Sequence, residues 1–267
     1  MSTLTDKNNA RQITAALTQL DIKPPAAVAA AYERTTRISA GTGNLAPKDE
    51  DLYHAIASAL DGRRDPAADE EVQRCLAGFA IANQGVAMGV ETILYDQLQA
   101  VCIEHSDALV TALARPFTQA AKTLTAAHQA IGNVALEDSA SIIRKGSAAV
   151  EAWSGAHAAV TTINAAVAGW FALAEFTHAA PNDPRYPALR LAAVDFQTWE
   201  NHELERRKVT PWEATLLGLT LSLPTFAQYA ARVEAIEVGR QRAAVAAIPI
   251  DGQRSYIAGR EIRVGGS

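Results

Sequence analysis

The sequence is poor in aromatic residues and, over two long stretches, in proline. Only 6% of its 267 residues are aromatic although 49% are hydrophobic, so a core must be built mainly from Ala, Leu, Val and Ile. No proline lies between Pro66 and Pro116 or between Pro116 and Pro181, and about a quarter of positions 67–180 are alanine. Nothing in these runs forces a helix to stop, and alanine is the best helix former. We therefore expect long, closely packed helices in the middle of the chain.

Cysteine, positive charge and long apolar runs are also scarce. Cys75 and Cys102 would lie roughly 40 Å apart in an unbroken helix, which excludes a disulfide and favours two small buried residues in a reducing compartment. The net charge is −5, with both signs mixed along the chain, which argues against a nucleic-acid partner. The longest uncharged stretch near the centre, 158–174, is too short and too weakly apolar for a good membrane span.

The N-terminus has no cationic segment followed by an apolar core, so no signal peptide is predicted. We expect a protein that is cytoplasmic or incorporated in a particle, without a nucleic-acid or membrane partner.

The pattern predicts an all-α fold, namely an elongated helical bundle with long antiparallel central helices, short N-terminal helices and a C-terminal arm or small β-hairpin. Four segments are expected along the chain: short N-terminal helices over 1–64, a long-helix hairpin or bundle over 65–180, C-terminal helices packed on it over 181–247, and an extended tail over 248–267.

Local signals punctuate these segments. In the first segment, helices are separated by Pro24-Pro25 and by Gly41-Thr42-Gly43-Asn44, and Gly62 closes the third. A break is expected near Gly132-Asn133. One helix face is expected along Leu189, Ala192, Phe196 and Trp199, ending at Arg206-Arg207-Lys208. Thr210-Pro211-Trp212-Glu213 is a strong helix start, and Pro224 opens a last helix that reaches about Ala246.

Two lines of residues are candidates for packing or self-association. The first is the apolar stripe Val72, Leu76, Phe79, Val86, Val90 and Ile93, interrupted by Asn83. A polar residue on such a stripe can fix register between helices, although an ordinary, half-exposed Asn is the plainer interpretation. Gly85 and Gly89 form a G-x-x-x-G spacing that suits close approach of another backbone.

The second line has the most regular spacing in the chain. It consists of Val150, Trp153, His157, Val160, Asn164, Val167 and Phe171. A seam of this length needs a partner helix, in this chain or in another copy, as in a coiled coil. His157 is expected as a hydrogen-bonded core residue rather than a ligand.

The tail supplies further contact candidates. They are Tyr256, Ile257, Ile262 and Val264, in two short apolar segments without an obvious partner in the chain.

No catalytic or ligand-binding motif is present. The phosphate-binding loop, the dinucleotide fingerprint and the nucleophile elbow are all missing. Glu175 and His178 give a single Glu-x-x-His spacing, whereas a di-iron bundle needs two. No catalytic residue, metal or cofactor is predicted, and the sequence leans toward a non-enzymatic role.

These observations favour a structural or scaffold-like assembly protein of a larger bacterial or bacteriophage particle (a virion component, for instance), acting through helix–helix and tail-mediated contacts. It would form an oligomer or bind other components of the assembly. Two alternatives stay open. One is a helical-bundle enzyme or small-ligand binder with a pocket lined by residues such as Trp153, His157, Trp170 and Glu175. The other is a helical pore-forming protein that uses 158–174.

Overall fold

The computed structural model describes residues 3–42, 48–83, 85–180 and 185–246. Within these ranges the protein has eleven α-helices, one 3-10 helix and no strand beyond a single antiparallel bridge between Ala192 and Leu221. The predicted all-α fold is confirmed. The elongated bundle with long antiparallel central helices stays a prediction, and the predicted C-terminal arm lies outside the described residues.

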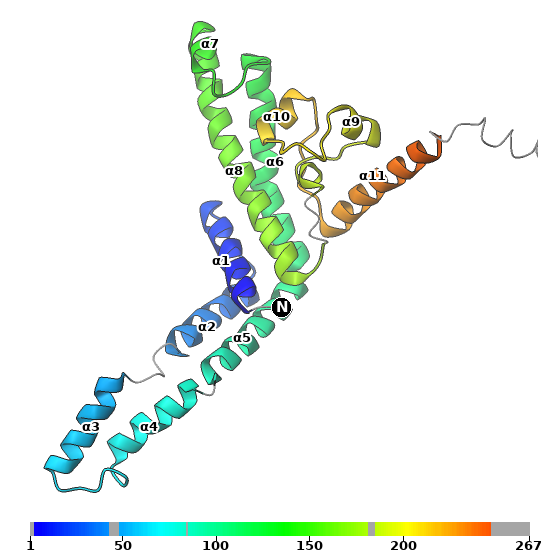
Figure 1. Ribbon diagram of the computed structural model, residues 1–267. Helices are drawn as coiled ribbons and strands as arrows, with labels where there is room; N and C mark the ends of the chain where they lie inside the picture. Colours follow the sequence, from blue (N-terminus) through cyan, green and yellow to red (C-terminus); the bar gives the residue numbers. More distant parts are fainter. Residues whose placement is uncertain (1–2, 43–47, 84, 181–184, 247–267) are drawn as a thin grey trace, which may run out of the picture. The chain divides into compact units, whose positions relative to one another are not determined.

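The helices follow one another along the chain (Figure 1). They are α1 (Thr3–Gln19), α2 (Ala26–Thr42), α3 (Asp49–Asp61), α4 (Glu70–Asn83), α5 (Val86–Glu104), α6 (Ser106–Ile131), α7 (Ser139–Arg144), α8 (Ser147–Thr177), the 3-10 helix η1 (Pro187–Arg190), α9 (Phe196–Asn201), α10 (Pro211–Leu216) and α11 (Phe226–Ala246).

The chain divides into two compact units. Unit 1 comprises Met1–Leu113 and Ala168–Ala179, and unit 2 comprises Ala114–Val167 and Ala180–Ser267. The long helices α6 and α8 therefore contribute to both units. The boundaries of the four segments expected from the sequence stay predictions.

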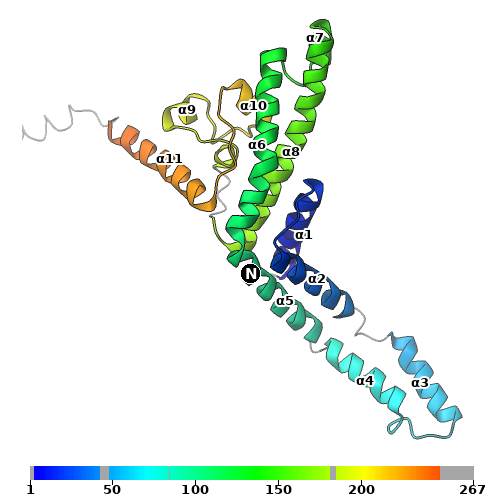
Figure 2. The ribbon, with the colours of Figure 1, turned by 180° about the vertical axis from the view of Figure 1, so that it is seen from behind.

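Unit 1 is built on α1, α2 and α5, which we call the α1–α2–α5 bundle. Helix α2 lies along α5, and α1 also contacts α5 (Figures 1 and 2). Its buried side chains include Ile13, Leu17, Val28, Leu98 and Cys102. Gly169 of α8 allows a close contact here, because a Cβ at this position would lie 2.7 Å from the Ala16 Cβ.

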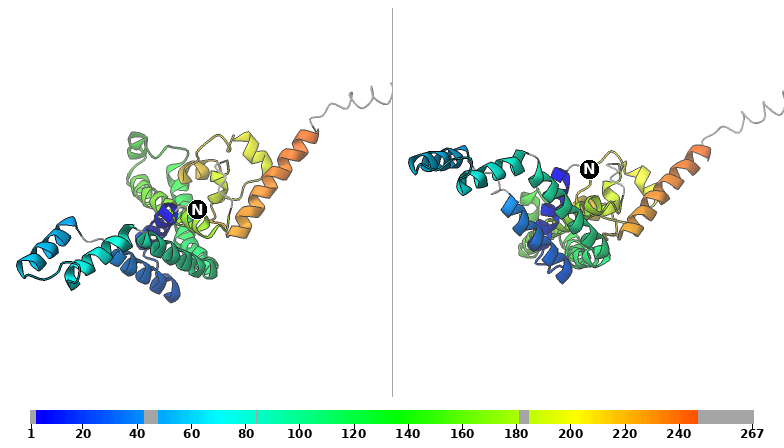
Figure 3. Two further views of the ribbon diagram at one scale, coloured as in Figure 1. Left: turned by 60° about the horizontal axis from the view of Figure 1, so that its bottom comes forward. Right: turned by 90° about the horizontal axis from the view of Figure 1, so that it is seen from below.

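Helices α3 and α4 form a second part of unit 1. They lie side by side, joined by residues 62–69, as Figure 3 also shows. The buried carboxylate of Asp69 fixes this turn: it accepts hydrogen bonds from the backbone N–H groups of Glu71 and Val72 and pairs with Arg64. We call residues 49–83 the acidic hairpin, for the charge described below.

In unit 2, α6 and α8 lie side by side (Figures 1 and 2), and Gly155 of α8 faces the methyl group of Thr123. Two indole N–H groups tie the connection after α6 to other helices. Trp153 donates to the Leu136 carbonyl at 2.8 Å and Trp212 to the Val134 carbonyl at 3.0 Å. A hydrogen-bonded Arg232 joins α11 to the carbonyl groups of Leu189 and Ser222.

Several local sequence signals are confirmed. Three N-terminal helices are present, with Gly62 at the end of the third, and α6 ends just before Gly132. The Thr210 hydroxyl accepts from the Glu213 backbone N–H, and the Glu213 carboxylate accepts from the Thr210 N–H, so the expected capping box starts α10. Helix α11 begins at Phe226, two residues after Pro224, and continues to Ala246, the last described residue.

Other expectations were wrong. Gly41 and Thr42, which were expected in the loop after the second helix, lie instead in the last turn of α2. The single helix expected over Leu189 to Lys208 is instead η1, the bridge at Ala192 and the short α9. The physical reason is a new helix start at Asp195, whose carboxylate accepts the Thr198 backbone N–H at 2.9 Å.

Candidate functional site

The longest candidate line, on α8, is only partly covered. Val150, Trp153, Val160, Val167 and Phe171 are half-buried, whereas His157 and Asn164 are exposed. His157 is therefore not the core residue that the spacing predicted. Its ring packs edge-to-face on Trp153, with centroids 5.2 Å apart and an interplanar angle of 76°.

The side of α8 that is buried is a neighbouring line of mainly small residues. It consists of Ala149, Ala156, Ala159, Ile163, Ala166 and Trp170. Each of these residues directly precedes a residue of the predicted line, so the buried face of α8 is rotated by about 100° around the helix axis from the predicted face. Alanine lets a neighbouring backbone approach closely, so the core face follows small side chains and the larger ones lie at its flank. As a contact between copies, the predicted line stays a prediction.

The pocket considered for a ligand-binding bundle stays a prediction, because its candidate residues fall in different units. Trp153 and His157 belong to unit 2, while Trp170 and Glu175 belong to unit 1. Within the described ranges, no group of three or more His, Cys, Asp or Glu side chains is placed to hold a metal ion.

The first candidate stripe is interrupted where the sequence predicted continuity. Asn83 is the last residue of α4, and Gly85, with φ of +67°, precedes α5. A Cβ at Gly85 or Gly89 would meet no other atom within 4 Å. In the part of the chain that the structure describes, the G-x-x-x-G spacing therefore does not form the expected close helix contact.

This interruption changes which stripe residues are buried. Val72 is buried, but Leu76 is 50% exposed and Ile93 is 58% exposed. Gly85 has a left-handed backbone conformation, so the 3.6-residue period of α4 does not continue into α5. The stripe residues of the two helices therefore do not form one continuous face toward a single partner.

The acidic hairpin shows a feature that the sequence analysis missed. Its core consists of small buried residues, Ala55, Ala59, Val72 and Cys75, with Leu52 and Ile56 partly buried against them. Larger apolar side chains face outward: Tyr53 is 66% exposed, Leu60 60% and Leu76 50%. The fully buried positions of the hairpin thus hold small side chains, while three large apolar ones are exposed.

The exposed apolar residues share one side of the hairpin. Tyr53 and Leu60 are two turns apart on α3, about a quarter turn beyond its buried line, and Leu76 is displaced in the same sense on α4. Because the two helices run in opposite directions, these displacements place the three side chains on the same side.

The hairpin also concentrates the charge of the chain. Residues 49–83 contain eight carboxylates and three arginines, a net charge of −5 that equals the net charge of the whole protein. The expected mixing of the two signs does not hold here. This concentration was visible in the sequence and is the signal that would have singled out the segment.

The tail candidates Tyr256, Ile257, Ile262 and Val264 lie outside the described residues. Among the described helices, α8 is long and apolar enough to cross a membrane by length and composition, with 56% of its most apolar window buried. Core helices of soluble proteins pass the same test, so this is weak support for the pore-forming alternative. Comparisons with protein-family models, curated proteins and solved structures found no match.

Proposed function

We propose that this chain is a non-enzymatic structural or assembly protein of a larger bacterial or bacteriophage particle, and that copies of it associate through helix faces. The observation that carries the proposal is the acidic hairpin, which buries small side chains and exposes Tyr53, Leu60 and Leu76. Exposed apolar residues grouped on one surface mark interaction sites more often than single exposed residues do.

The size of the hairpin supports the same conclusion. Segments of fewer than about 40 residues rarely bury enough surface to be stable without a disulfide, a metal or a partner chain. Both cysteines of the protein are free, and only one of them lies in the hairpin. A partner that covers the apolar side would supply the missing burial.

Two further features extend the proposal. The half-buried line on α8, from Val150 to Phe171, offers a second helix face, and the tail residues Tyr256, Ile257, Ile262 and Val264 offer apolar groups for contacts with neighbours. Other components of the particle would use these surfaces.

The test is the molar mass by light scattering over a wide concentration range. We expect the mass to rise above 28.3 kDa as concentration increases. Leu60→Ser should shift this rise to roughly tenfold higher concentration, since a buried leucine contributes about 1.5 to 3 kcal/mol. Ile143→Ser is the matched control, because Ile143 on α7 is also 60% exposed but lies outside the hairpin.

The salt dependence of the molar mass tests whether the associating surfaces are two acidic hairpins. Two acidic hairpins repel each other, so added salt should strengthen association between copies of this chain. A mass of 28.3 kDa at every concentration, at both low and high salt, would contradict the proposal.

A further inference from the structure

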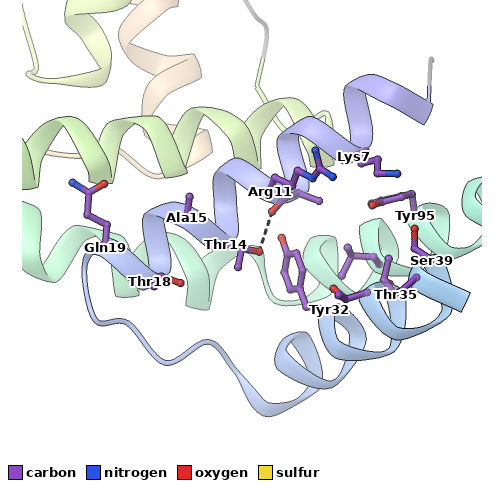
Figure 4. Close-up of a pocket in the computed structure, with 14 residues that line it drawn as sticks. Lys7, Arg11, Thr14, Ala15, Thr18, Gln19, Tyr32, Thr35, Ser39 and Tyr95 are labelled. Atoms are coloured by element: carbon purple, nitrogen blue, oxygen red, sulfur yellow. Dashed lines mark hydrogen bonds between the residues drawn. The ribbon is translucent and has the colours of Figure 1, made fainter. Parts of the chain in front are cut away.

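A cavity in unit 1 lies among α1, α2 and α5. Its volume is about 850 Å³, which falls in the range of small-molecule sites. Its apolar wall includes Ala10, Tyr95 and Leu98, and hydroxyl groups of threonine and serine residues from α1 and α2 line the remainder (Figure 4).

The charged residues that line this cavity are both cations. Lys7 and Arg11 lie one turn apart on α1, and none of the lining side chains is acidic. Lys7 is already neutralised by Glu91, which lies outside the lining: its Nζ is 3.0 Å from Glu91 Oε1, and the Ser39 hydroxyl donates to the same oxygen at 2.7 Å. Arg11 has no hydrogen bond or ion pair with the described residues, and its charge acts on Glu91 only from a greater distance, as a minor cause of the lowered Glu91 pKa. Its guanidinium therefore keeps its hydrogen-bond donors for a ligand.

A buried donor lies beside Arg11. The Tyr32 hydroxyl is buried and makes no hydrogen bond of acceptable geometry with the described residues, although the Thr14 hydroxyl and the Cys102 thiol lie close enough to influence its pKa. Figure 4 shows it directed from α2 toward α1, next to Thr14. Burial is the main cause that raises the pKa of Tyr32, so the phenol stays protonated and can donate. An unsatisfied buried donor is costly, and an acceptor atom of a ligand would relieve that cost.

We propose that this cavity binds an organic monoanion with a long apolar body, such as a fatty carboxylate. The carboxylate lies between the Arg11 guanidinium, which binds such groups well, and the Tyr32 hydroxyl. The apolar body lies against Ala10, Tyr95 and Leu98. This binding site is separate from the acidic hairpin and does not depend on the proposed assembly role.

Isothermal titration calorimetry on the full chain tests whether the cavity prefers a negatively charged ligand head group. The probes are dodecanoate, dodecanol and dodecyltrimethylammonium, all below their micellar concentrations. We expect saturable binding of dodecanoate, about tenfold weaker binding of the alcohol and still weaker binding of the cation. Arg11→Gln should weaken dodecanoate binding about tenfold, whereas Arg34→Gln, an equal change of charge at an exposed residue of α2 outside the cavity, should not.

Tyr32→Phe distinguishes a binding role from a structural one. Removing an unsatisfied buried hydroxyl should raise the melting temperature of the free protein, while it weakens dodecanoate binding about threefold or more. Leu60→Ser in the hairpin should leave dodecanoate binding unchanged even if it abolishes association. The proposal is overturned if dodecanoate does not bind saturably, if Arg11→Gln leaves its affinity unchanged, or if Tyr32→Phe does so.

Discussion

The acidic hairpin and the α1–α2–α5 bundle belong to the same compact unit, yet their cores differ in size and in the side chains that fill them. The bundle buries branched residues such as Ile13, Leu17 and Val28, although α5 also exposes Met88 and Ile93. The hairpin has a smaller buried set, Ala55, Ala59, Val72 and Cys75, and exposes Tyr53, Leu60 and Leu76. Each part contains one buried cysteine, Cys102 in the bundle and Cys75 in the hairpin. We therefore expect the bundle to be stable through its own core, and, under the proposed assembly role, the hairpin to gain stability when a partner covers it.

The largest expected effect compares one core substitution in each part. Ile13→Ala removes a side chain that is 2% exposed and should lower the free energy of unfolding of unit 1 by about 3 kcal/mol. Val72→Ala, in the hairpin, should lower the free energy of local opening of residues 49–83 by about 1 kcal/mol and leave the global stability unchanged. Urea denaturation measures the first effect, and amide hydrogen exchange over residues 49–83 measures the second. If Val72→Ala lowered the global stability as much as Ile13→Ala does, the hairpin and the bundle would unfold as one body.

The reaction rates of the two cysteines compare the stability of the hairpin with that of the bundle, without any substitution in either core. Burial raises the pKa of the Cys102 thiol to about 11, so it must be exposed by unfolding before it reacts. Cys75 should become accessible whenever the hairpin opens locally. We expect Cys75 to react with an aromatic disulfide reagent on the order of a hundredfold faster, since local opening costs less than global unfolding.

The variants Cys75→Ser and Cys102→Ser assign the two reaction phases. In addition, high protein concentration should slow the Cys75 phase if copies cover the hairpin. Equal rates for the two thiols at every concentration would remove the distinction between the hairpin and the bundle.

The sequence predicted features that depend on one helix at a time. The all-α fold follows from alanine content and the placement of proline, and the start of α10 follows from the Thr210 and Glu213 pair, because a cap is a contact between residues three apart. Burial on α8 could not be predicted in this way. The regular spacing of large apolar residues identified the line from Val150 to Phe171 as the packing face. The contact with α6 depends instead on how closely the two backbones approach, and the adjacent alanines allow the closer approach, so they form the buried face.

The break at Gly85 shows the same limitation. A glycine in a helical pattern fits either close packing or a left-handed residue between helices, and the spacing to Gly89 favoured the first interpretation. The structure has the second, and the stripe that included Leu76 therefore does not face one partner. The exposed side of the hairpin was not predicted because the regular spacing placed Leu76 on one continuous stripe with residues of α5.

The smallest expected effect compares one glutamate ion pair from each part. Hydrogen bonds from Ser39 and then from Lys7 lower the pKa of Glu91 in the bundle. A carboxyl group whose pKa is lower in the folded state stabilises the protein above its unfolded pKa, about 4.3, and loses this contribution as pH falls through the folded value. Glu91→Gln should therefore lower the free energy of unfolding by about 1 kcal/mol at neutral pH and change it little at strongly acidic pH.

Glu71→Gln is the control. Glu71 in the hairpin pairs with Arg74, but 65% of its side chain is exposed, and such surface pairs contribute little to stability. Urea denaturation between neutral and strongly acidic pH measures both variants, and a pH-independent cost for Glu91→Gln would show that the lost contact is not the ionised one.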